Sequence, residues 1–304
     1  MNELDALTPG VPVSAPDLAP NPMPTGPRRS IRMHDFQFSN GQNIADIPDV
    51  DVPPQAHFVH TFGPDPENWS EAMASRFAND WILASLLEKR SFEMHKVYEL
   101  VPRSSVGKKR IYKPRPVFKI KILPPDAHNP FPALEKFKYR QTIAAYTKSM
   151  VMGVDFEEKR ASTVRWEATL IIMGIANHFQ LSLTLIDIKT FFLYGDLTDE
   201  VYMEQPPEWE DSAYPASEFV CRLLKSMYGL PQAPHRAQLK LKEVLLEAGF
   251  RQTAADDCIY VWGNPGDDSF AVVGTHVDDI LCAGTPSGRA LAVKALAKTF
   301  ECTV

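Results

Sequence analysis

A pair of aspartates set between two apolar runs constrains the fold more than any other feature of this sequence. Phe270–Val277 and Ile280–Ala283 are rich in the residues that fill a sheet, and Asp278-Asp279 lies between them. Two strand-like runs so close together predict a β-hairpin with both carboxylates at its turn. Adjacent like charges between buried strands are costly unless a cation neutralises them. The pair therefore indicates a site for a divalent cation.

A third carboxylate, Asp187, has a similar setting. It lies near the end of an apolar strand predicted at Leu183–Ile188, so its charge also emerges at the edge of a sheet. Phosphoryl transfer to a hydroxyl group uses two metal ions about 4 Å apart, which two or three carboxylates on strand ends hold rigidly. The alternative is that all three are ordinary turn aspartates. The chain has two other Asp pairs with structural explanations: Asp256-Asp257 fits the cap of a strand, and Asp267-Asp268 fits a turn.

The hydrophobic periodicity indicates an α+β sheet domain, because helices and strands alternate along the chain. Apolar positions three and four residues apart predict a helix face from Trp69 to Ser91. Further helices are predicted at 163–179, 238–248 and 289–300, and strands at 97–101, 115–122 and 183–188.

The first part of the chain has a different composition. Residues 1–56 hold ten of the 26 prolines, and we predict a disordered Pro-rich linker over residues 1–60. No apolar run is long enough to span a membrane, and the first residues lack a signal-peptide pattern. The four cysteines have no metal-type spacing, so we expect free thiols in a reducing compartment.

Positive charge is concentrated in one stretch. Between Arg103 and Arg140 there are eleven basic and two acidic residues, although the whole chain carries a net charge of −6. Such a split favours one surface for phosphates, with a merely solvated basic surface as the alternative.

Ordered sequence blocks from about residue 66 to 285 resemble the reverse transcriptase domain of copia-type retrotransposons. They include WSEAMASRF at 69–77, VFKIK at 117–121, GVDFEE at 153–158, DIKTFFLYGDLTDEVYMEQPPEW at 187–209, VCRLLKSMYGLPQAP at 220–234 and HVDDI at 276–280. The resemblance implies a right-hand polymerase with an antiparallel palm sheet packed on helices. The basic fingers would span about 66–180 and the palm about 181–304, and the thumb would be absent or incomplete.

The same resemblance implies a function and its partners. The domain is expected to be an RNA-directed DNA polymerase that transfers nucleotides to a primer 3′-hydroxyl with two Mg²⁺ ions, or Mn²⁺. Asp187, Asp278 and Asp279 are the implied metal ligands and catalytic residues. The implied partners are an RNA template, a DNA primer and deoxynucleoside triphosphates.

Five further residues are implied to bind substrate. Phe192 stands where the family has an aromatic residue that excludes a 2′-hydroxyl, although core packing is an alternative role. Gln232 stands where a glutamine contacts the incoming nucleotide. Lys119 or Lys121, together with Arg140, matches the cations that grip the triphosphate, for which the planar guanidinium of arginine is well suited.

Some residues depart from the family pattern. Phe191 replaces a small residue and would crowd the nucleotide unless its ring turns into the core, and His276 replaces a tyrosine. The sequence stops at Val304, as expected of a truncated copy. A catalytically silent remnant that binds nucleic acid at most is therefore the alternative function. An unrelated metal-dependent hydrolase would need a nucleophile or base near the aspartates, and none stands out.

Overall fold

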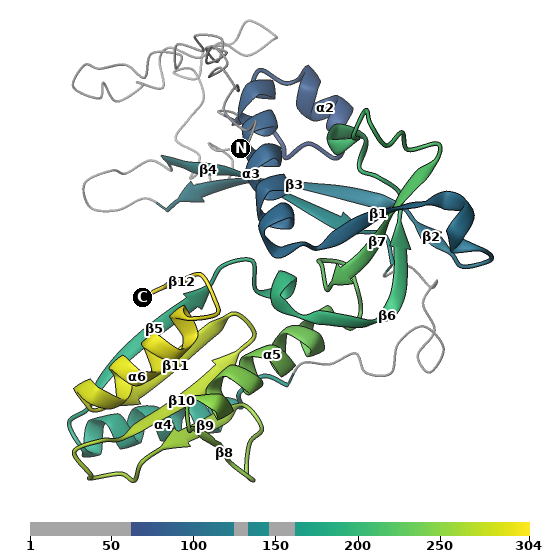
Figure 1. Cartoon of the computed structure of the whole chain (residues 1–304). Coiled ribbons are helices and arrows are strands. Elements are labelled where there is room, and N and C mark those ends of the chain that lie inside the picture. Colours follow the sequence, from purple (N-terminus) through teal and green to yellow (C-terminus); the bar gives the residue numbers. More distant parts are fainter. Residues whose placement is uncertain (1–61, 125–132, 146–161) are drawn as a thin grey trace, which may run out of the picture. The chain divides into compact units, whose positions relative to one another are not determined.

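The computed structural model of the chain describes residues 62–124, 133–145 and 162–304. It separates Met1–Thr61 from a compact unit, Phe62–Val304, whose described parts form three sheets and five helices (Figure 1). The linker predicted for residues 1–60 and the GVDFEE block lie outside the described residues. None of the described helices has the length and apolar character needed to cross a bilayer.

The largest sheet contains the hairpin that the sequence predicts. Its strand order is β12-β5-β11-β10-β9-β8, and every neighbouring pair is antiparallel. Strands β10 and β11 are joined through a two-residue turn, Val277-Asp278. The six strands are β5 (Ser182–Ile188), β8 (Arg251–Gln252), β9 (Ile259–Trp262), β10 (Ala271–His276), β11 (Asp279–Gly284) and β12 (Cys302–Thr303).

Helices cover both faces of this sheet, because successive side chains of a strand point to opposite sides. On one face, Val272 and Ala283 pack with α4 (Trp166–His178). On the other, Val273 and Cys282 belong to a core shared with α5 (Ala233–Glu247) and α6 (Pro286–Ala297). Figure 1 shows α4 on one side of the strands and α6 on the other. The hairpin is therefore held between two hydrophobic layers.

The start of α6 shows how closely the helices pack on the sheet. The Thr285 hydroxyl caps the helix by accepting from the amide of Gly288, and Pro286 occupies the first turn, where its missing N–H costs nothing. A Cβ at Gly288 would lie 2.2 Å from the carbonyl oxygen of Phe270. Only glycine allows the helix to start this close to β10.

A second sheet joins strands from two distant stretches of sequence in the order β1-β7-β6-β2. Its strands β1 and β6 each pair antiparallel with β7, whereas β2 pairs parallel with β6. The bounds are β1 (Tyr98–Pro102), β2 (Ile111–Tyr112), β6 (Asp196–Met203) and β7 (Phe219–Lys225).

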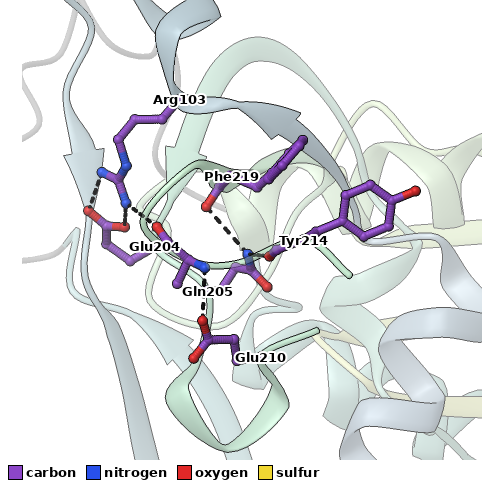
Figure 2. A network of polar contacts seen from close by, with 7 residues as sticks. Arg103, Glu204, Gln205, Glu210, Tyr214 and Phe219 are labelled. Atoms are coloured by element: carbon purple, nitrogen blue, oxygen red, sulfur yellow. Dashed lines mark hydrogen bonds and ion pairs between the residues drawn. The ribbon is translucent and has the colours of Figure 1, made fainter. Parts of the chain in front are cut away.

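A polar network fixes the long connection between β6 and β7 (Figure 2). The guanidinium of Arg103 donates to both carboxylate oxygens of Glu204 and to the carbonyl of Ala216 at 2.8 Å. The amide of Gln205 donates to the carbonyls of Tyr214 at 2.7 Å and Phe219 at 3.4 Å. These bonds satisfy backbone carbonyls and, with the short helix η5 (Pro207–Trp209), give the connection a fixed conformation.

The third sheet is a two-stranded ribbon of β3 (Pro114–Leu123) and β4 (Ala133–Ile143). One face carries aromatic rings that pack on α3 (Ala78–His95). Trp81 of α3 lies edge-on to Phe118 at 5.2 Å and to Phe137 at 4.8 Å between ring centroids. An isolated two-stranded ribbon is marginal in water, so α3 supplies the apolar contact that it needs.

The helix face predicted from Trp69 to Ser91 is wrong in two respects. The segment forms two helices, α2 (Trp69–Ala74) and α3, because the backbone at Ser75 is extended and the Ser75 hydroxyl donates back to the carbonyl of Ala72. The buried face of α3 also includes Ser85 and Glu88, whereas Leu87 is 59% exposed. Periodicity alone does not show that a polar pair faces the ribbon.

Candidate active site

The structure brings Asp187 and Asp279 together on neighbouring strands. In the antiparallel pairing of β5 with β11, these two residues lie directly opposite each other. The amide of Ile188 also donates to the carbonyl of Asp278 at 3.0 Å. Residues in such a pair point to the same face with their Cβ atoms about 5 Å apart. The register thus gathers the backbone of all three aspartates at one end of the sheet.

The charged form of the Asp279 carboxyl is disfavoured at this end of the sheet. Partial burial, followed by repulsion from Asp278 and Asp187, raises the pKa of the Asp279 carboxyl above its usual value, and His276 partly opposes this. In the described residues, no group of three or more His, Cys, Asp or Glu side chains is arranged to hold a metal ion. The backbone and the oxygen-donor chemistry fit a divalent cation, whereas the side chains are not converged on one point.

The hairpin turn is strained at the residue before Asp278. Val277 has φ +59°, in the left-handed region that β-branched residues rarely adopt. Two-residue hairpin turns require a positive φ, which glycine or asparagine usually supplies. A valine there costs roughly 1–2 kcal/mol. The paired strands on either side hold the turn in this conformation.

The two adjacent phenylalanines after β5 have different surroundings. They belong to the short helix η4 (Phe191–Tyr194). Phe191 is 3% exposed and contacts Phe300 in the core, so its ring turns away from the surface that it was expected to crowd. Phe192 is half-buried, and its ring lies edge-on to Tyr228 with 5.3 Å between centroids.

Gln232 is enclosed at the start of α5. Its side chain is 1% exposed, and its amide nitrogen lies 3.5 Å from the Asp199 carboxylate. Within the described residues, Gln232 Oε1 and Arg236 Nε are buried without a hydrogen-bond partner. The guanidinium of Arg236 lies 3.8 Å from the same carboxylate of Asp199. The sequence reasoning did not single out Asp199, whose proximity to Gln232 depends on the fold.

The predicted cations lie on the β3–β4 ribbon. Lys119 pairs in register with Lys138, and Lys121 pairs with Lys136. Lys119 forms an ion pair with Asp65 at 2.7 Å, whereas Lys121 has no ion pair among the residues that the structure describes. Burial and the neighbouring cations lower the pKa of Lys138 to about 8. Lys138 was not among the predicted site residues, although two of the cations that act on it, Arg140 and Lys136, are two residues away in the sequence; only Lys121 is brought near by the strand pairing.

Arg140, two residues from Lys138 on β4, also contacts an aromatic ring. Its guanidinium is 5.0 Å from the ring centroid of Tyr228, and its Nε is buried without a hydrogen-bond partner among the described residues. Tyr228 therefore contacts both Arg140 and Phe192. The structure connects these two predicted substrate-binding residues through a tyrosine that the sequence reasoning missed.

Comparisons with known proteins agree with this arrangement. Residues 96–303 match the family described as reverse transcriptase (RNA-dependent DNA polymerase). The chain is 30% identical over 240 residues to the retrovirus-related Pol polyprotein from transposon TNT 1-94 of Nicotiana tabacum, covering 78% of this chain and 17% of that protein. It is 34% identical over 152 residues to the Pol polyprotein from transposon RE2 of Arabidopsis thaliana, covering 50% and 10%.

A yeast relative extends the pattern. The Gag-Pol polyprotein of transposon Ty1-MR1 from Saccharomyces cerevisiae is 24% identical over 123 residues, covering 40% of this chain and 6% of that protein. The matched part of the chain spans less than a fifth of the length of each of these three relatives. The family match covers most of the described fold and includes all three aspartates. The chain therefore belongs to the copia-type reverse transcriptase family.

Proposed function

We propose that this chain is the polymerase domain of an RNA-directed DNA polymerase, which transfers nucleotides to a primer 3′-hydroxyl. The observation that carries the proposal is the strand register that sets Asp187 opposite Asp279, beside Asp278. Family membership suggests the reaction class, and the register brings the backbone of the aspartates that would bind the metal ions to one end of the sheet.

We assign the six-stranded sheet with α4, α5 and α6 to the palm, and α2, α3 and the β3–β4 ribbon to the fingers. The second sheet combines β1 and β2 with β6 and β7, on either side of residue 180. We therefore extend the proposed fingers to include residues 196–225.

Asp187, Asp278 and Asp279 would hold two Mg²⁺ ions, for which carboxylate oxygens are suitable ligands. Bound there, the ions would supply positive charge to the triphosphate and lower the pKa of the primer hydroxyl. The chain's own contribution is to keep Asp187 and Asp279 on paired strands, whose geometry is rigid. The raised pKa of Asp279 agrees with a site that is completed by a cation.

The remaining residues would bind and orient the substrates. Lys121, Lys136 and Lys138 share one face of the ribbon and would contact phosphates without reading sequence. Phe192, half-buried beside the acidic end of the sheet, would reject a 2′-hydroxyl. Gln232 would have to become exposed before it could contact the nucleotide, since its side chain is enclosed in this structure.

Primer extension on poly(rA)/oligo(dT) with dTTP and Mg²⁺ tests the proposal. We expect Asp278→Asn to lower the extension rate by about a thousandfold or more, because one of the carboxylates that would hold the metal ions is lost. Asp267→Asn is the matched control, since Asp267 lies in an exposed turn where its carboxylate accepts from Asn264. Extension that survives in Asp278→Asn contradicts the proposal.

Binding without catalysis is the second candidate function. The enclosed Gln232 and the unconverged carboxylates favour it. It predicts salt-dependent binding of poly(rA)/oligo(dT) with no extension in the unaltered chain, and no effect of Asp278→Asn on affinity. The same assay therefore decides between the two functions.

A further inference from the structure

Tyr228 stands where the loop before α5 meets the end of β4. The amide of Ile143 donates to the Tyr228 carbonyl at 2.9 Å. The next residue, Gly229, has φ +94°, and a Cβ there would lie 2.3 Å from the carbonyl oxygen of Ile143. The backbone of Tyr228 is thus fixed against the strand that carries Arg140.

The Tyr228 ring contacts two side chains with different proposed tasks. The ring lies edge-on to that of Phe192, the residue proposed to contact the nucleotide sugar, with 5.3 Å between ring centroids and 74° between ring planes. The guanidinium of Arg140, the residue proposed to bind the triphosphate, lies 5.0 Å from the centroid of the Tyr228 ring. Aromatic pairs and cations over aromatic rings are both attractive, and desolvation strengthens the latter.

The tyrosine is suited to a fixed, uncharged role. Burial raises the pKa of its phenol to about 12, so the ring is neutral throughout the working range of a polymerase. Arg140 Nε has no hydrogen-bond partner in the described parts of the chain, and the guanidinium lies against the Tyr228 ring, near the buried Glu88 carboxyl.

We infer that Tyr228 is a positioning residue of the nucleotide pocket, which holds Arg140 and Phe192 in a fixed relation and so links triphosphate binding to rejection of a 2′-hydroxyl. The inference rests on the proposed polymerase function. It assigns Tyr228 no contact with the reacting atoms.

Steady-state extension with dTTP and with UTP on poly(rA)/oligo(dT) tests this in the full chain. We expect Tyr228→Leu to raise the KM for dTTP about tenfold and to lower the ratio of kcat/KM for dTTP over UTP about tenfold, because both contacts are lost. The kcat for dTTP should change by less than about threefold, since the aspartates are untouched. Tyr228→Phe keeps the ring and should stay within about twofold of the unaltered chain in both quantities.

A second variant separates positioning from general destabilisation. Tyr260 is 1% exposed in the core of the large sheet, so Tyr260→Leu should lower the unfolding temperature while leaving the dTTP/UTP ratio unchanged. The inference is overturned if Tyr228→Leu folds and keeps that ratio, if only its KM changes, or if Tyr260→Leu shifts the ratio equally. An unaltered chain that neither extends primers nor binds dTTP with Mg²⁺ overturns the proposed function and this inference together. Extension with an unchanged ratio overturns the inference alone.

Discussion

The two charged regions of the molecule, one acidic and one basic, are supported in different ways. The carboxylate hairpin, β10 and β11 with Asp278 and Asp279, lies inside a six-stranded sheet with a hydrophobic core on each face. The lysine ribbon, β3 and β4, has two strands and one covered face. The neighbouring aspartates therefore lie on a sheet that is packed on both faces, whereas the neighbouring lysines lie on two strands that are packed on one face only.

This difference teaches how each region tolerates its charges. In the hairpin, partial burial and then repulsion from Asp278 and Asp187 raise the pKa of Asp279. The ribbon keeps most lysines in solvent, and the charge cost is concentrated on the partly buried Lys138, whose pKa falls to about 8. We therefore expect a bound cation to neutralise the carboxylates of the hairpin. We expect a polyanion to neutralise several lysines of the ribbon at once.

The end of the ribbon makes a close contact with the loop at Gly229. Gly229→Ala forces a Cβ into the carbonyl of Ile143 and requires a positive φ, so we expect a loss of unfolding free energy on the order of 3 kcal/mol. Gly249→Ala is the matched control. It has φ +90° but only ordinary contacts, at 3.8 Å to Trp262, and should cost about 1 kcal/mol. Urea unfolding measures both, and equal losses contradict the idea that close approach fixes the ribbon.

Glu88 of α3 lies beneath the ribbon as a buried acid. Burial raises the pKa of its carboxyl to about 7 from 4.5, so the folded state holds the proton more tightly than the unfolded state. Stability should then fall as pH rises from 4.5 to 7 and stay at the lower level above. Glu88→Gln should stabilise the chain by on the order of 2–3 kcal/mol at pH 8 and change little at pH 4.

Urea unfolding at pH 4 and pH 8 checks this. Glu93→Gln, an exposed position on the same helix, is the control and should show no gain at pH 8. A gain of the same size for Glu88→Gln at both pH values means that its carboxyl is not a buried acid.

The effect of Asp279→Asn on stability should depend on whether Mg²⁺ is present: the variant should be slightly more stable than the unaltered chain without the ion, and should gain less stability when the ion is added. Asp279→Asn removes repulsion, so we expect a small stabilisation at pH 7, below about 1 kcal/mol because the side chain is exposed. The raised acid pKa means that this gain disappears as pH falls and the carboxyl is protonated in both states. Thermal unfolding with and without Mg²⁺ measures it. A rise in unfolding temperature with Mg²⁺ that persists in Asp279→Asn contradicts a shared metal site.

The smallest expected effect concerns the charge of Lys138. Because its lowered pKa is about 8, the lysine loses its charge between pH 7 and pH 9, whereas Lys138→Arg keeps it. We expect the affinity of the unaltered chain for poly(rA)/oligo(dT) to fall about threefold more over this range than that of the variant. Fluorescence anisotropy titrations measure the affinities. Lys136→Arg, at an exposed position, should leave the pH dependence as in the unaltered chain.

The large sheet could be predicted from its apolar runs. The hairpin, β5 and helices α4, α5 and α6 all lie where hydrophobic periodicity placed them, with shifts of a few residues at their ends. Strand β4 was missed because its sequence, ALEKFKYRQTI, alternates lysines with aromatic residues and buries a glutamine, Gln141, at 0% exposure. Strand β7 pairs with β1, which lies more than a hundred residues earlier, and β6 pairs with β2, which lies about ninety residues earlier, so no local pattern predicts these pairings.

The candidate site was predicted unevenly for a physical reason. Charge between apolar runs pointed to Asp187, Asp278 and Asp279, since burial of like charges is costly wherever it occurs. Phe192, Gln232 and Arg140 were found only through resemblance. Their neighbours Tyr228 and Asp199 depend on how a loop and a strand meet, and that meeting is a property of the tertiary fold.

The pairing of β12 has a consequence for when the site can form. Asp187 lies between Asp279 of β11 and Thr303 of β12. Helix α6 connects these two strands, so the segment 279–303 pairs with β5 along both of its edges. Pairings this distant in sequence form late, because loop closure precedes any gain from them. During synthesis the strand that carries Asp187 emerges some ninety residues before its first partner. In a nascent chain, therefore, Asp187 has no paired strand beside it until the segment 279–303 has been translated.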